Sequence, residues 1–185
     1  MSAELLAVLP LVLVLLVISA FFSGSEAAYF SLTQTQRRSI AKSKSNSDRV
    51  ASTLLNNAEQ LLMGILFWNL VTNIAYFSLI SRIGLQLESS SQDAGSYFAV
   101  ISIGGLVAII LIGEFLPKSI GVLYPLNVVR WVAIPLALAI RVVSSLAPFL
   151  QFVTETSRRL LVPGIQPEPY LGTDRKSTRL NSSHV

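Results

Sequence analysis

Three long apolar blocks alternate with polar stretches along the chain. They run from Leu5 to Phe22, from Leu61 to Ile80 and from Tyr97 to Phe115. Each is close to the roughly 20 residues that an α-helix needs to cross about 30 Å of hydrocarbon. The pattern therefore predicts an all-α membrane protein with three transmembrane helices, at about residues 5–31, 61–82 and 97–118.

The connector between the first two blocks is polar and basic. It runs from Thr33 to Gln60, and apolar residues return at helical spacing from Val50 onward, which predicts two short cytoplasmic helices. Its basic residues are Arg37, Arg38, Lys42, Lys44 and Arg49. The loop from Gly84 to Ser96 has no basic residue, and only Arg82, at the outer end of the second span, is at odds with this asymmetry. Because cytoplasmic flanks are enriched in Lys and Arg, we expect the N-terminus outside and the C-terminus inside.

The stretch 125–162 is apolar but interrupted by charges and prolines. The interrupting residues are Arg130, Pro135, Arg141 and Pro148. A central arginine costs about 2.5 to 3.5 kcal/mol on insertion scales, and a fourth crossing would place Arg158 and Arg159 outside. The pattern favours a juxtamembrane belt of amphipathic helices along the inner interface, with arginines reaching the headgroups. A true fourth crossing is the alternative.

Composition agrees with a membrane protein of one domain. Hydrophobic residues make up 52% of the 185 residues and charged ones 13%, against about 25% charged residues in soluble domains. The chain has no cysteine, which excludes disulfides, thiol nucleophiles and thiolate-bound metals. A cleaved signal peptide is the rival interpretation of the first block, but a basic segment before it is missing, so we expect a retained helix.

The C-terminal segment has the features of a sequencing artefact. Residues Asp174 to His184 reverse-translate without mismatch to the sequence of a common sequencing adapter, so 174–185 is expected not to be protein. Without it the formal net charge falls from +4 to +2 and the only histidine disappears. The basic charge is then no argument for nucleic acid. Residues 163–173 are expected to be a linker toward missing cytosolic domains; a real polar tail is the alternative for the last segment.

Polar side chains within the apolar blocks are the candidates for chemistry, because hydrocarbon offers them no water. Asn69 and Asn73 stand four residues apart, on one face of the second predicted helix. Two amide oxygens on one face can bind one ion. They can equally form hydrogen bonds between helices, worth about 1 kcal/mol in membranes.

A second cluster ends the first block. Ser23 and Ser25 flank Gly24, where a glycine can open the helix and expose backbone carbonyls beside the hydroxyls. The alternative is a glycine that allows close packing, with the serines as hydrogen-bonding residues. Glu26 follows as a weaker ligand candidate, since it also suits the headgroup level or helix packing.

A third cluster ends the third block. Glu114 follows Gly113 and lies one turn before Lys118, with Pro117 between them, a residue that removes a helical donor and frees a carbonyl. The alternative is a buried Glu114–Lys118 salt bridge, which carries a large desolvation penalty. Carboxylate, amide and hydroxyl oxygens together suit Mg²⁺ or Ca²⁺. With Glu114 as the main anionic ligand, the site would stay net positive and bind weakly.

In these three segments the chain resembles the transmembrane domain of the CNNM/CorC family of magnesium transport proteins. The matching segments are Phe22-Ser23-Gly24-Ser25-Glu26, Asn69-Leu70-Val71-Thr72-Asn73 and Gly113-Glu114-Phe115-Leu116-Pro117-Lys118, in the family's order. The resemblance covers about residues 5–165 and implies a transmembrane domain over 1–165. It also implies a homodimer with a Mg²⁺ site in each protomer, in which Ser23, Asn73 and Glu114 occupy ligand positions and Asn69 and Ser25 contribute further.

From this resemblance we expect a multi-pass protein of the cell membrane that transports Mg²⁺, in the direction of export. ATP would bind only to a cytosolic pair of CBS domains that this chain lacks. The alternative is a membrane anchor or sensor for such domains, without transport of its own. An enzyme is not expected, because the sequence has no paired intramembrane aspartates and no HExxH motif, and loses its only histidine with the adapter segment.

Overall fold

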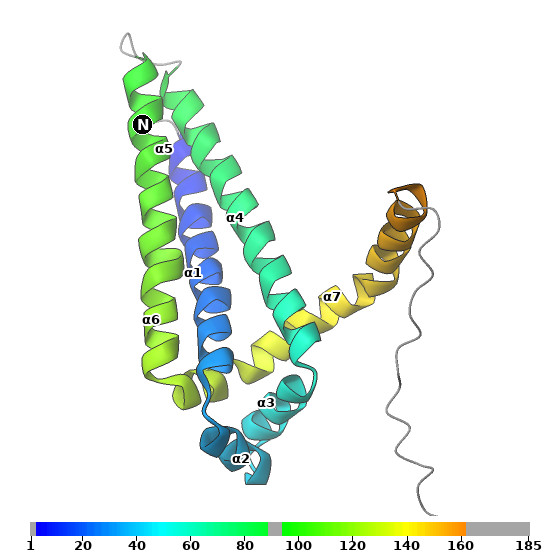
Figure 1. Ribbon diagram of the computed structural model, residues 1–185. Coiled ribbons are helices and arrows are strands. Elements are labelled where there is room, and N and C mark those ends of the chain that lie inside the picture. The colour runs from blue at the N-terminus through cyan, green and yellow to red at the C-terminus, as the bar shows by residue number, and fades with distance from the viewer. Residues whose placement is uncertain (1–2, 89–93, 162–185) are drawn as a thin grey trace, which may run out of the picture. The chain divides into compact units, whose positions relative to one another are not determined.

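The computed structural model describes residues 3–88 and 94–161, and the side chains of residues 8–86 and 98–145. The described part contains helices and no strands, which confirms the all-α prediction (Figure 1). The elements in order are α1 (Ala3–Ser31), α2 (Gln34–Lys42), α3 (Asn46–Asn56), α4 (Ala58–Glu88), α5 (Ala94–Ala108), the π-helix η1 (Ile109–Phe115), α6 (Leu116–Leu123) and α7 (Pro125–Leu161). The predicted linker 163–173 and the segment 174–185 lie outside the described residues.

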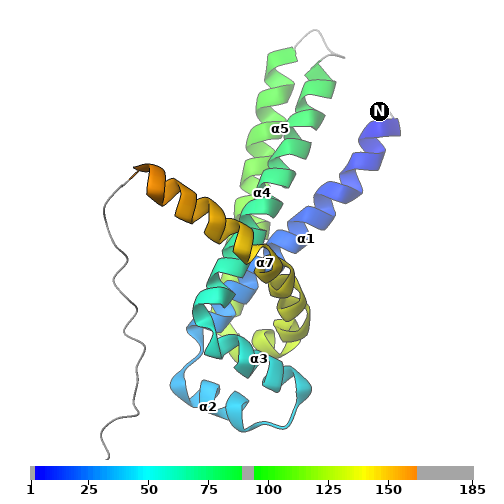
Figure 2. The same ribbon diagram turned by 90° about the vertical axis from the view of Figure 1, so that its right-hand side faces the viewer.

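The three predicted spans are long helices that pack together. One is α1, the second is α4, and the third is the continuous run of α5, η1 and α6. Figure 2 shows α1 diverging from α4 and α5 toward its N-terminus. By length and composition, four helical stretches can cross a membrane, one more than predicted. They are Val8–Ser31, Ala58–Gln86, Phe98–Leu123 and Pro125–Ser145.

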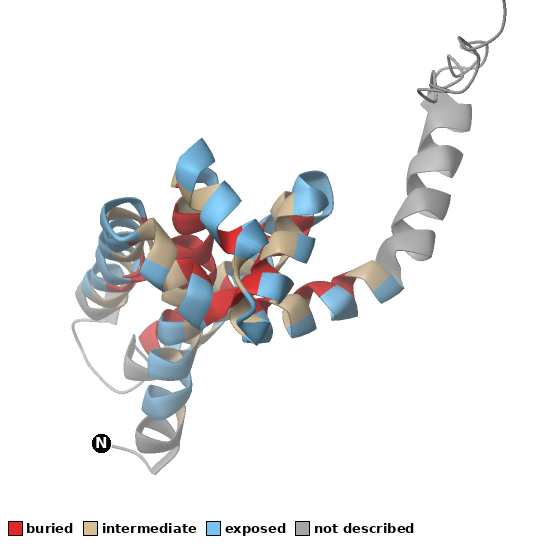
Figure 3. Cartoon of the chain, turned by 90° about the horizontal axis from the view of Figure 1, so that it is seen from below, coloured by how far each residue is buried: buried red, intermediate tan, exposed pale blue. Residues whose placement is uncertain are grey.

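The outward surface of these helices is apolar. Figure 3 shows buried residues on the surfaces that face one another and exposed residues on the outer faces. Many of the exposed residues are large and hydrophobic, for example Val17, Leu70 and Ile103, each about 60% exposed or more. A contiguous apolar surface of this kind is unfavourable in water and suits lipid. The chain is therefore a multi-pass membrane protein.

The polar connector folds as the two short helices that the sequence predicts. A reciprocal capping box of Thr33 and Gln36 starts α2, because the Thr33 hydroxyl accepts from the Gln36 amide while the Gln36 side chain accepts from the Thr33 amide. Ile40 of α2 and Ala51 of α3 are buried against the ends of α1 and α4. The connector thus packs on the bundle rather than lying free.

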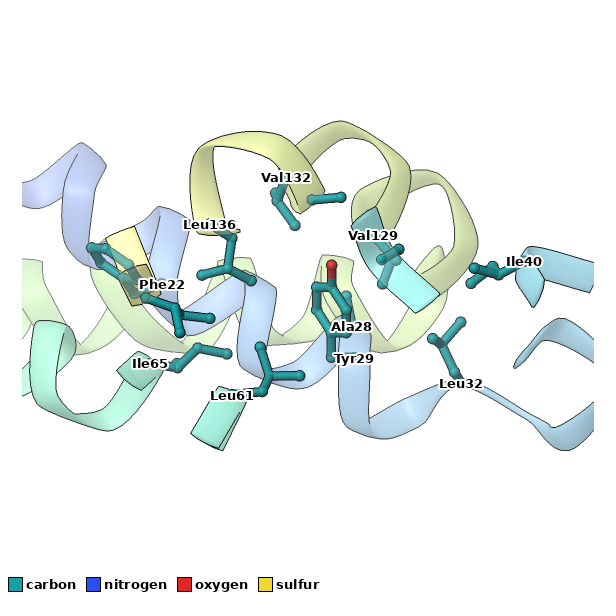
Figure 4. Packing of buried hydrophobic residues seen from close by; sticks show 13 residues of the cluster. Phe22, Ala28, Tyr29, Leu32, Ile40, Leu61, Ile65, Val129, Val132 and Leu136 are labelled. Carbon is teal, nitrogen blue, oxygen red and sulfur yellow. The ribbon is translucent and has the colours of Figure 1, made fainter. Parts of the chain in front are cut away.

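The main hydrophobic core lies where α1, α4 and the first part of α7 meet the connector. Figure 4 shows Tyr29 of α1 among these side chains, with its hydroxyl directed toward the part of α7 that carries Val129 and Val132. The buried members are Phe22, Ala28, Tyr29, Leu32, Ile40, Ala51, Leu61, Ile65, Val129, Val132, Ala133, Leu136 and Ile140. A second, smaller cluster joins Leu16, Tyr76, Ile80 and Ile109 toward the other end of the bundle.

The expectation of several juxtamembrane helices is wrong, because α7 is one continuous helix from Pro125 to Leu161. Neither Pro135 nor Pro148 ends it. A proline inside a helix costs about 3 kcal/mol, but the buried face of α7 around Val132 and Leu136 is anchored in the main core, which favours the helical path. Residues up to Leu146 form one compact unit, and the rest of α7 belongs to a second unit, Ala147–Val185.

Arg130, which was expected to reach lipid headgroups, forms an ion pair with Asp48. Its Nε donates to Asp48 Oδ1 at 2.9 Å and its Nη2 to Asp48 Oδ2 at 3.2 Å. Asp48 lies on α3 and is 1% exposed. These hydrogen bonds hold the pKa of Asp48 below its usual range, although burial acts in the opposite direction. A buried carboxylate on the connector is therefore neutralised by α7.

Candidate functional site

A chain of polar contacts links three helices in the middle of the bundle. The Ser19 hydroxyl of α1 donates to Asn73 Oδ1 of α4 at 3.1 Å, and lies 3.5 Å from Asn69 Oδ1. Asn73 Nδ2 in turn donates to Glu114 Oε1 of η1 at 3.0 Å. Of the residues that the sequence singled out, the structure thus brings together Asn69, Asn73 and Glu114.

Ser19 belongs to this series of polar contacts but was not predicted from the sequence. It is fully buried and stands one helical turn before Ser23, so the two hydroxyls share a face of α1. That spacing was a usable signal. Ser19 was not predicted as a site residue because it lies within an otherwise apolar run.

Ser23 lies on the same face as Ser19 and has no hydrogen-bond partner among the described residues. Its side chain is 0% exposed and its hydroxyl is unsatisfied. Contacts on either side of it hold α1 against the third span: Ser19 against Gly113, and Gly24 against Pro117. A buried hydroxyl without a partner is unfavourable unless an ion or water satisfies it, so Ser23 adds a free oxygen beside the polar chain.

The carboxylate of this site projects from a π-helix. In η1 the Leu116 amide bonds to the Leu111 carbonyl, five residues back. Pro117 cannot donate to Gly113, its α-helical partner, which leaves the Gly113 carbonyl without that bond. The sequence predicted the freed carbonyl at Pro117 but not the wider helix, which begins at Ile109. Single π-turns occur often at functional sites.

Gly113 and Gly24 are the two glycines where the helices approach most closely around the site. A Cβ at Gly113 would lie 3.1 Å from Ser19 Oγ, and one at Gly24 would lie 3.3 Å from the Pro117 carbonyl oxygen. The absence of a side chain at these two positions therefore allows the third span to lie close to α1.

Lys118 forms an ion pair with Glu26, not with Glu114. The distance from Lys118 Nζ to Glu26 Oε2 is 3.5 Å, and no ion pair in the described part of the chain joins Lys118 to Glu114. The alternative of a Glu114–Lys118 salt bridge is thus not what the structure shows. The Glu114 carboxylate instead accepts a hydrogen bond from the Asn73 amide.

Ser25 is not brought to the polar chain. Its hydroxyl donates to the Phe21 carbonyl oxygen at 2.6 Å, one turn back on α1. Its side chain lines an apolar cavity of about 390 Å³ that Phe21, Gly24 and Pro117 also border. Ser25 therefore faces away from Asn73, and its role as a metal ligand rests on the family resemblance alone.

Apolar clusters lie on both sides of the polar chain. On α1, Leu16 of the smaller cluster precedes Ser19, and Tyr29 of the main core follows Ser23. On α4 the order is the reverse, with Ile65 of the main core before Asn69 and Tyr76 of the smaller cluster after Asn73. Tyr76 also donates to the Gly105 carbonyl oxygen at 3.0 Å, which ties α4 to α5. The polar residues are thus enclosed between two apolar layers.

The donor set of this site is that of a hard cation. Among the described residues, no three His, Cys, Asp or Glu side chains gather. The available oxygens come from one carboxylate, two amides and two hydroxyls: Glu114, Asn69, Asn73, Ser19 and Ser23. Oxygen ligands suit Mg²⁺ or Ca²⁺ and not soft metals. A half-turn of the Asn73 amide would exchange its donor and acceptor and present a carbonyl oxygen beside Glu114.

Comparison with known proteins agrees with the motifs. Residues 10–173 match the family model described as CNNM, cyclin M transmembrane N-terminal domain. The UPF0053 inner membrane protein YfjD of Escherichia coli (strain K12) is 35% identical over 109 residues, which are 58% of this chain and 24% of that protein. A UPF0053 protein of Haemophilus influenzae is 30% identical over 115 residues, 62% of this chain and 26% of its own length. The match thus spans about a quarter of these relatives.

Proposed function

This chain belongs to the CNNM family of membrane proteins, whose function is membrane ion transport or an associated role, and we propose that it transports Mg²⁺ across the membrane in the direction of export. The observation that carries the proposal is the chain of contacts from Ser19 through Asn73 to Glu114. Three separate spans contribute its oxygens. It is enclosed between two apolar layers, as expected of a site that opens to one side at a time.

The composition of the site favours Mg²⁺ as the transported substrate. Glu114 supplies one negative charge, and Asn73, Ser19 and Ser23 supply neutral oxygens. A divalent ion with one carboxylate leaves a net positive site, which binds weakly and allows release. The hydroxyl of Ser23 has no hydrogen-bond partner among the described residues, which supports its role as a ligand, and Asn69 adds a fifth oxygen-bearing residue. Mg²⁺ retains water readily, so some of its six positions would be filled by water.

The proposal includes the orientation of the site, the location of the protein and its assembly. With the basic connector on the cytoplasmic side, Tyr76 lies on the outer side of the site and Glu26 on its inner side. We assign the protein to the cell membrane as a homodimer, and ATP would act only through cytosolic domains beyond the matched part. The relative from Escherichia coli is named as an inner membrane protein, which supports this location.

Calorimetric titration of the purified chain with Mg²⁺ tests the site. Glu114→Gln keeps the shape of the side chain and removes the only carboxylate from the donor set, so we expect at least about tenfold weaker binding, because affinity depends on ligand charge. Glu59→Gln is the matched control, since Glu59 is exposed near the start of α4. Equal Mg²⁺ affinity for Glu114→Gln and the wild type would refute the assignment.

The second candidate is a membrane anchor or sensor in which the ion only stabilises the fold. This candidate is favoured because the chain matches only about a quarter of each relative, and about three quarters of each relative lies outside the matched part. Mg²⁺ flux in proteoliposomes separates the two functions. A transporter passes Mg²⁺ at a rate that Glu114→Gln abolishes, whereas an anchor binds Mg²⁺ without flux.

A further inference from the structure

The Glu26–Lys118 ion pair lies one helical turn from the polar site, on the same side of it in both helices. Glu26 follows Ser23 by three residues on α1, and Lys118 follows Glu114 by four residues on the third span. The pair joins α1 to α6 with its charged atoms 3.5 Å apart. In the proposed orientation this is the cytoplasmic side.

Lys118 has a second carboxylate within reach. Residues four apart in a helix are neighbours on its surface, about 5 to 6 Å apart between Cβ atoms, and a lysine stem is long and flexible. The Lys118 ammonium can therefore pair with Glu26 across the helix interface, as in the structure, or with Glu114 along its own helix. A cation at the polar site and the ammonium at Glu114 compete for the same carboxylate.

The energetics of the pair suit an exchange of partners. The side chain of Lys118 is 43% exposed and that of Glu26 is 24% exposed. Ion pairs whose side chains are this exposed contribute little on their own, so the Glu26 contact can be broken at low cost. A fully buried pair would instead be locked, because separating its charges is strongly unfavourable.

We propose that Lys118 is a built-in competitor for the cation, held away from Glu114 by Glu26. This inference rests on the proposed Mg²⁺ site. With Mg²⁺ bound, the ammonium stays with Glu26. When the ion leaves toward the cytoplasm or the outside, the ammonium moves to Glu114 and neutralises its carboxylate, which would otherwise keep the Asn73 amide but no counter-ion. Glu26 and Lys118 are positioning residues that set the affinity of the site.

A double-mutant cycle measured by calorimetric Mg²⁺ titration tests the competition. Glu26→Gln releases Lys118 toward Glu114, so we expect at least about fivefold weaker Mg²⁺ binding, a usual size for coupling between sites. Lys118→Met removes the competitor, so binding becomes tighter by a similar factor. In the double variant the Glu26→Gln change has no further effect, and the affinity equals that of Lys118→Met.

The cycle separates competition from simple attraction of Mg²⁺ by Glu26. If Glu26 acts only through its own charge, Glu26→Gln weakens binding equally with or without Lys118, and the proposal is overturned. Lys118→Arg, which keeps the charge, should stay near the wild type. A merely structural ion pair predicts that Glu26→Gln and Lys118→Met lower the metal-free melting temperature alike and change affinity in the same direction.

The outcome for the wild type separates this inference from the function it rests on. If the wild type binds no Mg²⁺, the cation site and the competition are both refuted. If the wild type binds Mg²⁺ and Glu114→Gln does not, the site stands. Unchanged affinities in Glu26→Gln and Lys118→Met then refute the competition alone.

Discussion

At the residue scale, the geometry of the site depends on Ser19 and its hydroxyl group. It is buried, it donates to Asn73, and it contacts Gly113 of the neighbouring span. With the Ser19 proton directed at Asn73 Oδ1, the amide presents its Nδ2 to Glu114. A single hydroxyl thus fixes the orientation of an amide and, through it, the position of the carboxylate.

Replacing Ser19 with alanine tests this role. We expect Ser19→Ala to lower the free energy of unfolding by about 1 kcal/mol, since one hydrogen bond is lost, and to weaken Mg²⁺ binding as Asn73 becomes free to rotate. Ser78→Ala is the control, because the Ser78 hydroxyl bonds only to its own helix at Ile74 and is exposed. Thermal unfolding and Mg²⁺ titration of both variants report the two effects, and a loss of affinity as large in Ser78→Ala would contradict the assignment.

At the scale of elements, α6 approaches the backbone of α1 closely at Gly121. A Cβ at Gly121 would lie 2.6 Å from the Gly24 carbonyl oxygen and 2.9 Å from the Ala28 amide nitrogen. Both are backbone atoms, which cannot move aside as a flexible side chain can. The contact of these helices therefore depends on the absence of a side chain at Gly121.

Gly121→Ala is expected to destabilise the protein by about 1 to 3 kcal/mol, the usual effect of overpacking, even though alanine favours helices. Gly104→Ala is the matched control, since a Cβ there meets no atom within 4 Å, and it should be neutral or stabilise by up to about 1 kcal/mol. The two melting temperatures should move in opposite directions relative to the wild type; equal shifts would show that the α1–α6 approach is not tight.

The contact of α3 with α7 is governed by unequal burial of two charges. Asp48 is 1% exposed, whereas Arg130 is 43% exposed. If Asp48 is removed, the arginine reaches water; if Arg130 is removed, the carboxylate stays buried without a partner, which is the more unfavourable case.

We therefore expect Arg130→Gln to lower the melting temperature more than Asp48→Asn does. The contribution of the pair has a definite pH dependence, because the pKa of Asp48 is lowered in the folded state. The stabilisation is complete above about pH 4, the usual carboxyl pKa, and disappears as pH falls through the lowered value. In Asp48→Asn this acid-dependent part is absent. Melting curves from neutral to acidic pH check both statements, and a larger loss in Asp48→Asn would contradict them.

At the scale of the whole molecule, the path of α7 decides whether the chain crosses the membrane three or four times. Its buried residues from Val129 to Ile140 all belong to the core at the connector end of the bundle. Ala139 accepts a hydrogen bond from Trp68 Nε1, so after fifteen residues α7 has reached only the first third of α4. This supports the juxtamembrane path over a fourth crossing.

Single-cysteine labelling from either side of the membrane tests the path of α7. The sequence has no native cysteine, so only the introduced one can react. Ser45→Cys in the connector and Leu85→Cys near the end of α4 mark the two sides. We expect Ser145→Cys to be labelled from the same side as Ser45→Cys. Labelling from the side of Leu85→Cys would establish a fourth crossing.

Much of the element structure could be predicted from the sequence. The length of the apolar blocks gave the three spans, the return of helical spacing at Val50 gave two connector helices, and the four-residue spacing of Asn69 and Asn73 placed them on one face. These are local properties: they depend on hydrogen bonding and hydrophobicity along one segment, which bilayer thickness and helical period constrain strongly.

Which side chains pair with one another, in contrast, was decided only by the tertiary structure. Periodicity tells which face of a helix carries a residue but not what lies opposite, so the sequence could not tell that Lys118 pairs with Glu26 or Arg130 with Asp48. The same applies to Ser19, whose importance comes from Asn73 on another helix, and to α7, whose prolines are tolerated because its face is buried in the core. Long-range packing selects among contacts that are locally equivalent, and this selection fixes which oxygens can surround an ion.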